Sequence, residues 1–326
     1  MIEAANAYAQ LFTKLRSDGV PGRWPAATLN RAPHKPLLLL AVLDLFAEGQ
    51  ISSNLIELSP DLGELFTLYW ARVMPPDQRG NIALPFFHLR SSPFWHLLPR
   101  PGMEAFLAAT NQIRSVSQLR ETVLGARLDE DLYALLRIQE PREQIRAAII
   151  GAYFALEAQS ALADQGTVNN ESYTYSEELL KQAKEVREAL TEAQKYRPLV
   201  RDQGFRRAIV TAYNHSCAMC GLRVQTPDGH TAAAAAHIIP WSQTYDDRVV
   251  NGMALCQLCH WGFDEGMLGV TAKYTILTSP QLEAEYNVPL HLPGLKGKSL
   301  TLPAEPLFWP EVSGLEAHRE ETFRRR

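Results

Sequence analysis

The four cysteines of this 326-residue chain form two pairs of equal spacing, Cys217 with Cys220 and Cys256 with Cys259. Two Cys-x-x-Cys pairs in an intracellular chain are typical of a tetrahedral zinc site, because each pair brings two thiolates to one ion. Two redox motifs or four buried free thiols are the alternative interpretation. A zinc ion with four thiolate ligands has no open position for a substrate, so we expect this zinc to be structural.

Residues able to hydrolyse a phosphodiester lie between and just after these pairs. Such a reaction needs a base that activates water and a cation that neutralises developing charge. His237 is expected near the end of a strand over residues 232–240, and it is the candidate base because imidazole titrates near neutral pH. His260 and Asp264 lie four apart on a predicted helix, so they share one face and can bind one divalent ion, Mg²⁺ or Mn²⁺. Asn251 either orients His237 or adds an oxygen to the metal shell.

These residues belong to four motifs that follow one another within residues 196–280. The motifs are Cys217-x-x-Cys220, Ala235-Ala236-His237-Ile238-Ile239-Pro240, Asn251-Gly252 and Leu255-Cys256-x-x-Cys259-His260-Trp261-x-Phe263-Asp264-x-Gly266. Their order resembles the HNH (ββα-metal) endonucleases, in the zinc-stapled restriction-enzyme branch. The resemblance implies a catalytic base at His237, a supporting Asn251 and metal ligands at His260 and Asp264. Many members have Asp or His before the catalytic histidine, whereas this chain has Ala236. Either the metal is held more loosely, or substrate phosphate and water complete its shell.

A second group of candidate residues lies in the N-terminal half. Basic side chains precede a predicted buried helix over residues 36–46, where they and the helix N-terminus can contact phosphates. Aromatic and proline side chains over residues 84–95 can form a small dry pocket. The candidates for DNA contact are Arg31, His34, Lys35, Pro85, Phe86, Phe87, His88 and Arg90, with Arg206 and Arg207 near the start of a later predicted helix.

Two of these segments also resemble a known domain. They are His34-Lys35-Pro36-Leu37-Leu38-Leu39-Leu40 and Pro85-Phe86-Phe87-His88-Leu89, followed by Phe94-Trp95. They look like the sulfur-binding domain of McrA-like restriction enzymes, which recognises phosphorothioate DNA. The resemblance implies that His34 and Lys35 contact the backbone and that Pro85 and its neighbours line the cavity. Sulfur is larger and more poorly hydrated than oxygen, so an apolar cavity favours it while nearby cations hold the backbone charge.

The sequence therefore predicts a modification-dependent restriction endonuclease that acts on double-stranded DNA. Methylated or hydroxymethylated bases are an alternative target, because Phe86, Phe87 and Trp95 could form a cage for a flipped base. Unmodified DNA is another target, and a catalytically inactive DNA-binding protein is a third interpretation. One HNH site cuts one strand, so a double-strand break would require a homodimer.

The elements that position these residues predict an α+β chain with four parts. Residues 1–160 form a mixed helical and β DNA-recognition domain, residues 161–195 a linker and connecting helix, residues 196–280 the HNH domain and residues 281–326 a C-terminal extension. In the first part we expect helices over 4–15, 36–46 and 62–73, extended segments over 83–89 and 94–98, and helices over 103–160. The polar, turn-rich segment 163–172 predicts the linker. The extension carries a charged helix over 314–325.

Bulk composition narrows the class of protein. Hydrophobic residues make up 46% and charged residues 21%, and the net charge of −4 with a pI near 6.2 argues against a general coater of DNA. A local basic surface is still compatible with a nuclease. No apolar run approaches the ~20 residues that span a bilayer, and the N-terminus lacks the features of a signal peptide. We therefore expect no membrane partner and a cytoplasmic protein.

Overall fold

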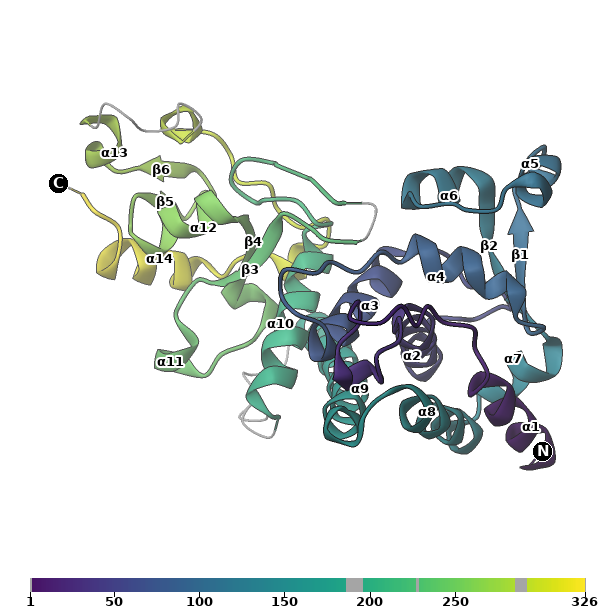
Figure 1. Cartoon of the computed structure of the whole chain (residues 1–326). Helices are drawn as coiled ribbons and strands as arrows, with labels where there is room; N and C mark the ends of the chain where they lie inside the picture. The colour runs from purple at the N-terminus through teal and green to yellow at the C-terminus, as the bar shows by residue number, and fades with distance from the viewer. Residues whose placement is uncertain (1, 186–195, 227–228, 285–291, 326) are drawn as a thin grey trace. The chain divides into compact units, whose positions relative to one another are not determined.

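The computed structural model describes residues 2–185, 196–226, 229–284 and 292–325 (Figure 1). It separates into two compact units: unit 1 is Met1–Asn170 with Thr226–His230, and unit 2 is Glu171–Gln225 with Thr231–Arg326. Helices and short antiparallel strands occur in both, so the predicted α+β class is confirmed. Within these described ranges, no helix combines the length and the apolarity that crossing a bilayer requires.

Unit 1 is built around the helix predicted over residues 36–46. This helix, α2, is apolar on all sides and packs against α3, α4 and α8 (Figure 1). The helices of unit 1 are α1 (Ile2–Phe12), α2 (His34–Ala47), α3 (Pro60–Val73), α4 (Ala83–His88), α5 (Glu104–Ala109), α6 (Val116–Thr122), α7 (Glu130–Leu136), α8 (Gln139–Tyr153) and the first part of α9 (Leu156–Glu185). Its strands are β1 (Trp95–Pro99) and β2 (Val123–Leu128).

The segment that carries Pro85 is helix α4, which corrects the extended segment predicted over residues 83–89. Pro85 falls in the first turn, where its missing N–H leaves no helical hydrogen bond unmade. Phe86 and Phe87 are both fully buried in the core. A short run that is apolar on every side does not reveal its period, so its sequence could not distinguish a helix from a strand.

Strand β1 confirms the extended segment predicted near residues 94–98, but its partner β2 lies where the sequence predicts only helices. The two strands pair antiparallel, with Trp95 opposite Leu128. Ala126 of β2 also exchanges backbone hydrogen bonds of 2.8 and 2.9 Å with Ile56. Strand formation in β2 thus depends on partners distant in the sequence, which its local pattern does not encode.

Residues 163–172, predicted as a linker, lie inside the long helix α9. The glycine in this segment serves close packing rather than a turn. A Cβ on Gly166 would lie 2.9 Å from Arg146 Nη1 and 2.9 Å from the Tyr69 hydroxyl oxygen. Only glycine therefore lets α9 approach α3 and α8 this closely.

The polar residues of the same segment belong to a buried network. Asn169 donates a hydrogen bond from Nδ2 to Asp44 Oδ2 over 2.7 Å, and Arg146 Nη1 lies 2.8 Å from Asp44 Oδ1. Arg146 also donates to the Tyr69 hydroxyl over 2.9 Å. All four side chains are buried. Asn169 and Gln165 of the predicted linker thus have buried hydrogen-bond partners inside unit 1.

Unit 2 contains the predicted strand, strand, helix order. Its helices are the rest of α9, α10 (Pro198–Ala212), α11 (Trp241–Thr244), α12 (Gln257–Asp264), α13 (Pro280–Ala284) and α14 (Val312–Glu321). Its strands are β3 (Ala233–His237), β4 (Gly252–Cys256), β5 (Leu268–Val270) and β6 (Ile276–Thr278). β3 pairs antiparallel with β4, and β5 pairs with β6. The connecting helix is confirmed up to residue 185, and its predicted remainder, 186–195, lies outside the described residues.

Helix α10 packs directly on the β3–β4 pair. Gly252, at the start of β4, makes this approach possible, because a Cβ there would lie 2.3 Å from Ile209 Cδ1 and 3.0 Å from the Phe205 ring. Its backbone is extended, with a φ of −133°. Gly252 is therefore needed for space and not for a turn, and the Asn-Gly pair opens a strand.

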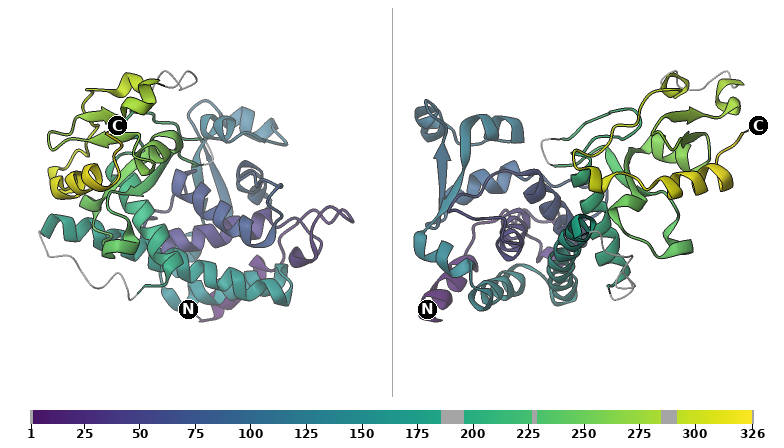
Figure 2. Two further views of the ribbon diagram at one scale, coloured as in Figure 1. Left: turned by 90° about the vertical axis from the view of Figure 1, so that its left-hand side faces the viewer. Right: turned by 180° about the vertical axis from the view of Figure 1, so that it is seen from behind.

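The C-terminal extension is part of unit 2. Its helix α14, together with Leu300 and Phe308, contributes to the same core as β3 and β4 (yellow in Figures 1 and 2). His318 of α14 stacks on Phe263 of α12, with ring centroids 3.6 Å apart. The predicted boundary near residue 280 therefore does not separate a second folded unit.

Candidate functional site

His237 is the last residue of β3, and its side chain is 23% exposed, which leaves it accessible to a substrate. Its imidazole stacks on Phe205 of α10, with ring centroids 3.9 Å apart and planes 6° from parallel. The preceding residue, Ala236, is buried, as expected for a strand whose successive side chains face opposite sides. The strand and α10 together fix the plane of the candidate base.

Asp247 contacts this imidazole directly. Its Oδ1 lies 2.8 Å from His237 Nε2, and its side chain is 1% exposed. The Tyr175 hydroxyl donates to Oδ2 over 3.0 Å, and Arg201 Nε lies 3.4 Å from the same oxygen. Burial and the Asp247 carboxylate raise the pKa of Tyr175, so its hydroxyl remains a donor. Asp247 was not among the residues that the sequence pointed to, and an acidic residue between two histidine motifs was the available signal.

Asn251 acts on the backbone next to His237. Its Oδ1 accepts a hydrogen bond from Ile239 N over 3.0 Å, while its Nδ2 donates to Ile239 O over 3.1 Å and to Asp246 O over 2.9 Å. The side chain is buried. These bonds hold the chain that leaves β3, two residues after His237. They favour the first of the two roles that the sequence left open.

His260 and Asp264 share one face of α12, as predicted. His260 Nε2 lies 3.4 Å from Asp264 Oδ2, and both side chains are partly exposed. Two ligand atoms at ~2.1 Å from one ion and at right angles to each other lie about 3 Å apart, so this pair fits a divalent ion. Burial raises the pKa of Asp264. A bound cation would favour the ionised carboxylate.

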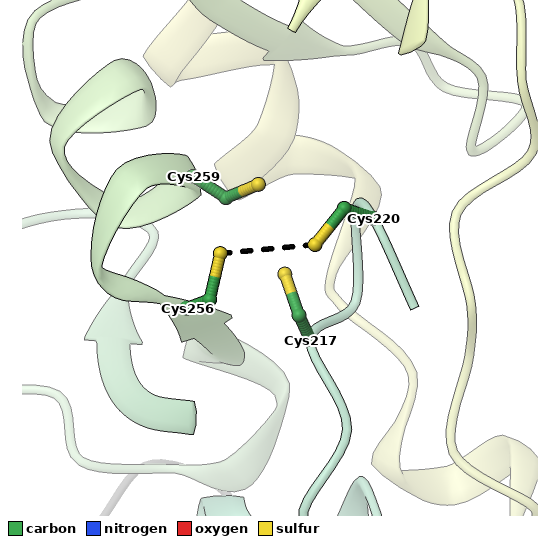
Figure 3. A group of neighbouring side chains, drawn as sticks. All are labelled: Cys217, Cys220, Cys256 and Cys259. Atoms are coloured by element: carbon green, nitrogen blue, oxygen red, sulfur yellow. Dashed lines mark hydrogen bonds between the residues drawn. The ribbon is translucent and has the colours of Figure 1, made fainter. Parts of the chain in front are cut away.

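The four cysteines form one cluster, with their sulfur atoms pointing toward one another (Figure 3). All four Sγ atoms lie within 4.8 Å of each other, and Cys220 Sγ is 3.7 Å from Cys256 Sγ. Tetrahedral Zn–S bonds of ~2.3 Å require sulfur atoms about 3.8 Å apart, so the cluster fits zinc. The hydrogen bond with Cys217 raises the pKa of Cys259, so full ionisation of the cluster requires a cation. The cluster joins the loop before β3 to the start of α12.

Arg206 and Arg207 lie in the middle of α10 and are half-buried. The Arg207 guanidinium lies over the Tyr173 ring, 4.8 Å from its centroid. This contact uses one face of the guanidinium and orients the side chain. Contact of either arginine with a DNA phosphate stays a prediction.

A separate cavity of about 860 Å³ opens in unit 1, at the start of α2 and along α4. Such a volume is within the range of small-molecule sites. Its basic lining residues are Arg16, Arg23, Lys35 and Arg79, and Asp18 is the acidic residue of the lining. Its aromatic and apolar lining residues are Trp24, Trp70, Leu84 and Pro85. The cavity thus combines an excess of positive charge with an apolar wall, which suits a weakly hydrated anion.

His34 lies between two tryptophans of this cavity. Its ring centroid is 5.4 Å from that of Trp24 and 4.6 Å from that of Trp70, with edge-on geometry at both. Burial, with a smaller contribution from the Arg23 charge, lowers the pKa of His34 to about 4. The ring is therefore neutral near pH 7 and offers one N–H donor without adding a charge.

The pKa values of the two other titratable candidates, Lys35 and His88, are also lowered. Burial, followed by the Arg16 charge, lowers the pKa of Lys35, whose Nζ lies 3.3 Å from Ser91 Oγ. Burial, followed by the charges of Lys35 and Arg90, lowers the pKa of His88. A bound anion would offset the repulsion among these groups, so the cavity is electrostatically prepared for one.

Three of the predicted DNA-contact residues serve the interior instead. Phe86 and Phe87 are 0% exposed, so they cannot reach DNA, which corrects their assignment. Arg90 donates to Leu107 O over 3.0 Å and to Thr110 O over 2.7 Å, and its guanidinium lies over the Phe87 ring. These interactions make Arg90 a structural residue. Arg31 is exposed and lies outside the cavity lining, so its contact with DNA stays a prediction.

Several lining residues escaped the sequence interpretation. Arg16, Arg23, Arg79, Trp24 and Trp70 come from three separate segments, two of them loops. Trp24, in a Gly/Pro-rich loop, was the available signal, because an isolated tryptophan in such a loop needs a binding or packing role.

Two family models match the chain. Residues 217–271 match the model of the HNH endonuclease family. Residues 23–168 match the model of the ScoMcrA-like DNA sulfur-binding domain. The first match contains both histidines and the four cysteines of the candidate active site, and the second contains His34, Lys35 and Pro85. Both resemblances found in the sequence are confirmed at the level of domains.

Among solved structures, the chain is similar to one titled "Modification dependent TagI restriction endonuclease". The two are 21% identical over 36% of this chain and 36% of that chain, with a TM-score of 0.27. The chain thus matches about a third of the length of that protein. No curated protein matches the chain.

Proposed function

We propose that this chain, which joins a ScoMcrA-like DNA sulfur-binding domain to an HNH endonuclease domain, is a restriction endonuclease specific for phosphorothioate-modified DNA. The observation that carries this proposal is the cavity of unit 1, because it pairs cations with an apolar wall inside the matched sulfur-binding domain. The matched HNH endonuclease domain would supply the cleavage. Target choice therefore belongs to unit 1 and hydrolysis to unit 2.

The cavity suits a phosphorothioate for two separate reasons. Lys35 and Arg79 attract the negative charge that the modified and the ordinary phosphate share, so they contribute affinity for any DNA. Leu84, Pro85 and the Trp70 ring offer a surface that a poorly hydrated sulfur atom can contact at little desolvation cost, while an oxygen would lose water there. Affinity and sulfur preference thus depend on different side chains.

In the nuclease site, His237 removes a proton from the water whose oxygen attacks the phosphorus atom. His260 and Asp264 would hold a divalent ion, Mg²⁺ or Mn²⁺, which supplies charge neutralisation at the phosphate when bound. Asn251 keeps the end of β3 in place. The four-cysteine cluster would hold zinc as a structural ion, since it has no open position.

The partner in this proposal is double-stranded DNA, with Arg206 and Arg207 of α10 contacting its phosphates. One active site per chain cuts one strand, so a homodimer makes the double-strand break. We place the protein in the cytoplasm, where cysteine clusters remain reduced and able to bind zinc. A cage of Phe86, Phe87 and Trp95 for a flipped base is disfavoured, because all three side chains are buried.

The test compares two duplexes of one sequence, with and without a phosphorothioate, in Mg²⁺ or Mn²⁺. We expect cleavage of the sulfur-bearing duplex, and a loss of about 10²–10⁴-fold in rate for His237→Ala with unchanged DNA binding. Equal cleavage of both duplexes would overturn the sulfur specificity and retain the nuclease. Binding without cleavage in any metal would overturn the enzymatic part.

A pair of cavity variants separates affinity from specificity. Lys35→Ala should weaken binding of both duplexes about 10-fold, because a charge-assisted contact is lost, and leave their ratio unchanged. Leu84→Ser should reduce the ratio of the affinities for the modified and unmodified duplexes, with little effect on binding of the unmodified one. Equilibrium binding at fixed salt measures both. If both variants reduce the ratio of affinities equally, the apolar wall and the cations of the cavity do not act separately.

A further inference from the structure

Asp247 is a buried carboxylate whose two oxygens face different partners. Its Oδ1 lies against His237 Nε2, at 2.8 Å. Its Oδ2 faces two donors, the Tyr175 hydroxyl at 3.0 Å and Arg201 Nε at 3.4 Å. The guanidinium of Arg201 is itself fixed, because it lies over the Trp241 ring at 3.6 Å from the centroid and ion-pairs with Asp202. The carboxylate therefore cannot exchange its two oxygens without breaking several contacts.

This arrangement determines which ring nitrogen of His237 carries the proton. An ionised carboxylate only accepts hydrogen bonds, so Nε2 at 2.8 Å must be the N–H donor. A neutral imidazole has one N–H and one lone pair, which leaves the lone pair on Nδ1. Stacking on Phe205 holds the ring plane, so rotation of the ring is restricted. Once Nδ1 takes a proton, the charge that appears on the ring is 2.8 Å from a carboxylate.

We propose that Asp247 is the positioning residue of the nuclease, which holds His237 in the tautomer with Nδ1 free to act as the base. The inference rests on the proposed hydrolysis and deepens it, because it names the reacting nitrogen and the group that selects it. Tyr175 and Arg201 support this role by holding Oδ2, so Oδ1 is presented to the histidine. Asn251 fixes the backbone, and Asp247 fixes the ring.

The substitution Asp247→Asn gives this proposal a sharp consequence. Arg201 has only donors, so the amide of the new side chain should turn its oxygen toward Arg201 and Tyr175. Its NH₂ group then faces His237 Nε2, which must become an acceptor. The proton moves to Nδ1, and the base loses its lone pair. A change of one atom thus predicts the opposite tautomer with little change in volume.

The experiment measures the ring ¹⁵N chemical shifts of His237 in histidine-labelled full-length protein, with His237→Gln to assign the signals. We expect the Nε2–H tautomer in the wild type and the Nδ1–H tautomer in Asp247→Asn, with about a 100-fold lower kcat and an unchanged KM for DNA. The matched control is Glu316→Gln, because Glu316 ion-pairs with Arg319 on α14 through its partly exposed side chain. It should change neither tautomer nor kcat.

Two results would overturn the proposal. One is an Nδ1–H tautomer in the wild type, a measurement that needs no variant to fold. The other is an Asp247→Asn protein that cuts at the wild-type rate. If the wild type cuts no DNA while its spectrum shows the expected tautomer and switch, the proposed hydrolysis fails and the tautomer assignment holds. The two failures are therefore distinguishable.

Discussion

In unit 1, His34 lies edge-on to Trp24 and Trp70 near the Arg23 charge, whereas in unit 2, His237 stacks on Phe205 and contacts the Asp247 carboxylate. The first environment disfavours a proton on the ring and lowers the pKa of His34 to about 4. The environment of His237 orients its ring and places the Asp247 carboxylate beside it. The same side chain is thus kept neutral by burial and nearby cations in unit 1, whereas in unit 2 a carboxylate lies beside it, as the proposed role of His237 in proton transfer requires.

The two units also differ in what holds them together. Unit 1 has a large core around α2, crossed by the buried network of Asp44, Arg146 and Asn169. Unit 2 has strands of three to five residues and relies on the four-cysteine cluster to join its loop, hairpin and helix. Short strands with little area to bury need a cross-link, which a metal ion provides. A different perturbation should therefore unfold each unit.

The largest expected effect is zinc removal, which should unfold the nuclease site and spare unit 1. Structural zinc in small domains contributes apparent binding free energies of about 10–16 kcal/mol. A strong chelator, or the substitution Cys259→Ala, should abolish amide protection in β3, β4 and α12 while α2 remains protected. Hydrogen exchange of the full chain measures both regions at once. Retained protection in β4 after complete zinc loss would contradict a structural role for the ion.

Asp44→Ala should produce the reverse pattern. It removes the buried carboxylate beside Arg146, which keeps only its ion pair with the half-exposed Glu143. We therefore expect a cost near the lower end of about 3–5 kcal/mol. Exchange should therefore accelerate in α2, α8 and the first part of α9, with β3 and β4 unaffected. Glu121→Ala, at an exposed position of α6, is the comparison variant. Equal acceleration in both units would mean that they unfold as one.

The smallest expected effect is a pH dependence of unit 1 that comes from His34. Because its pKa is lowered to about 4 in the folded chain, the unfolded chain binds the proton first as the pH falls below about 6.5. The contribution of His34 to the stability of unit 1 is thus fully present above pH 6.5, falls between pH 6.5 and 4, and changes no further below pH 4. The loss is at most about 3 kcal/mol.

His34→Gln should remove this part of the pH dependence, as measured by urea unfolding of unit 1 between pH 7 and 4. The comparison variant is His96→Gln, because His96 is exposed on β1 and pairs with Asp129. If the free energy of unfolding changes equally with pH in the wild type and in His34→Gln, His34 titrates normally in the folded state.

Much of unit 2 was predictable because its residues act through short spacings. The Cys-x-x-Cys pairs, the i, i+4 pair His260 and Asp264, and the strand that ends at His237 are local patterns, and the structure has all of them. Asp247 was not predictable in this way. Its role depends on Tyr175 and Arg201 from two different helices, and no spacing relates them to His237.

Unit 1 was less predictable, because its cavity is assembled from loops and helix ends that are distant in the sequence. Phe86 and Phe87 have the composition of a binding pocket and lie in the core, while Arg16 and Arg79 have no motif and line the cavity. Residues 163–172 have the composition of a linker and lie in a helix, where Asp44 accepts a hydrogen bond from Asn169 and Gly166 packs closely against Arg146.

By itself, the sequence determined the zinc cluster, the order of the nuclease motifs and the apolar helix at the centre of unit 1. Each of these depends on spacing or on local composition. The tertiary structure decided which side chains face the cavity, which buried partner Asn169 of α9 has and which carboxylate contacts His237. Those features depend on contacts between segments far apart in the chain, where burial and hydrogen-bond partners override local preference.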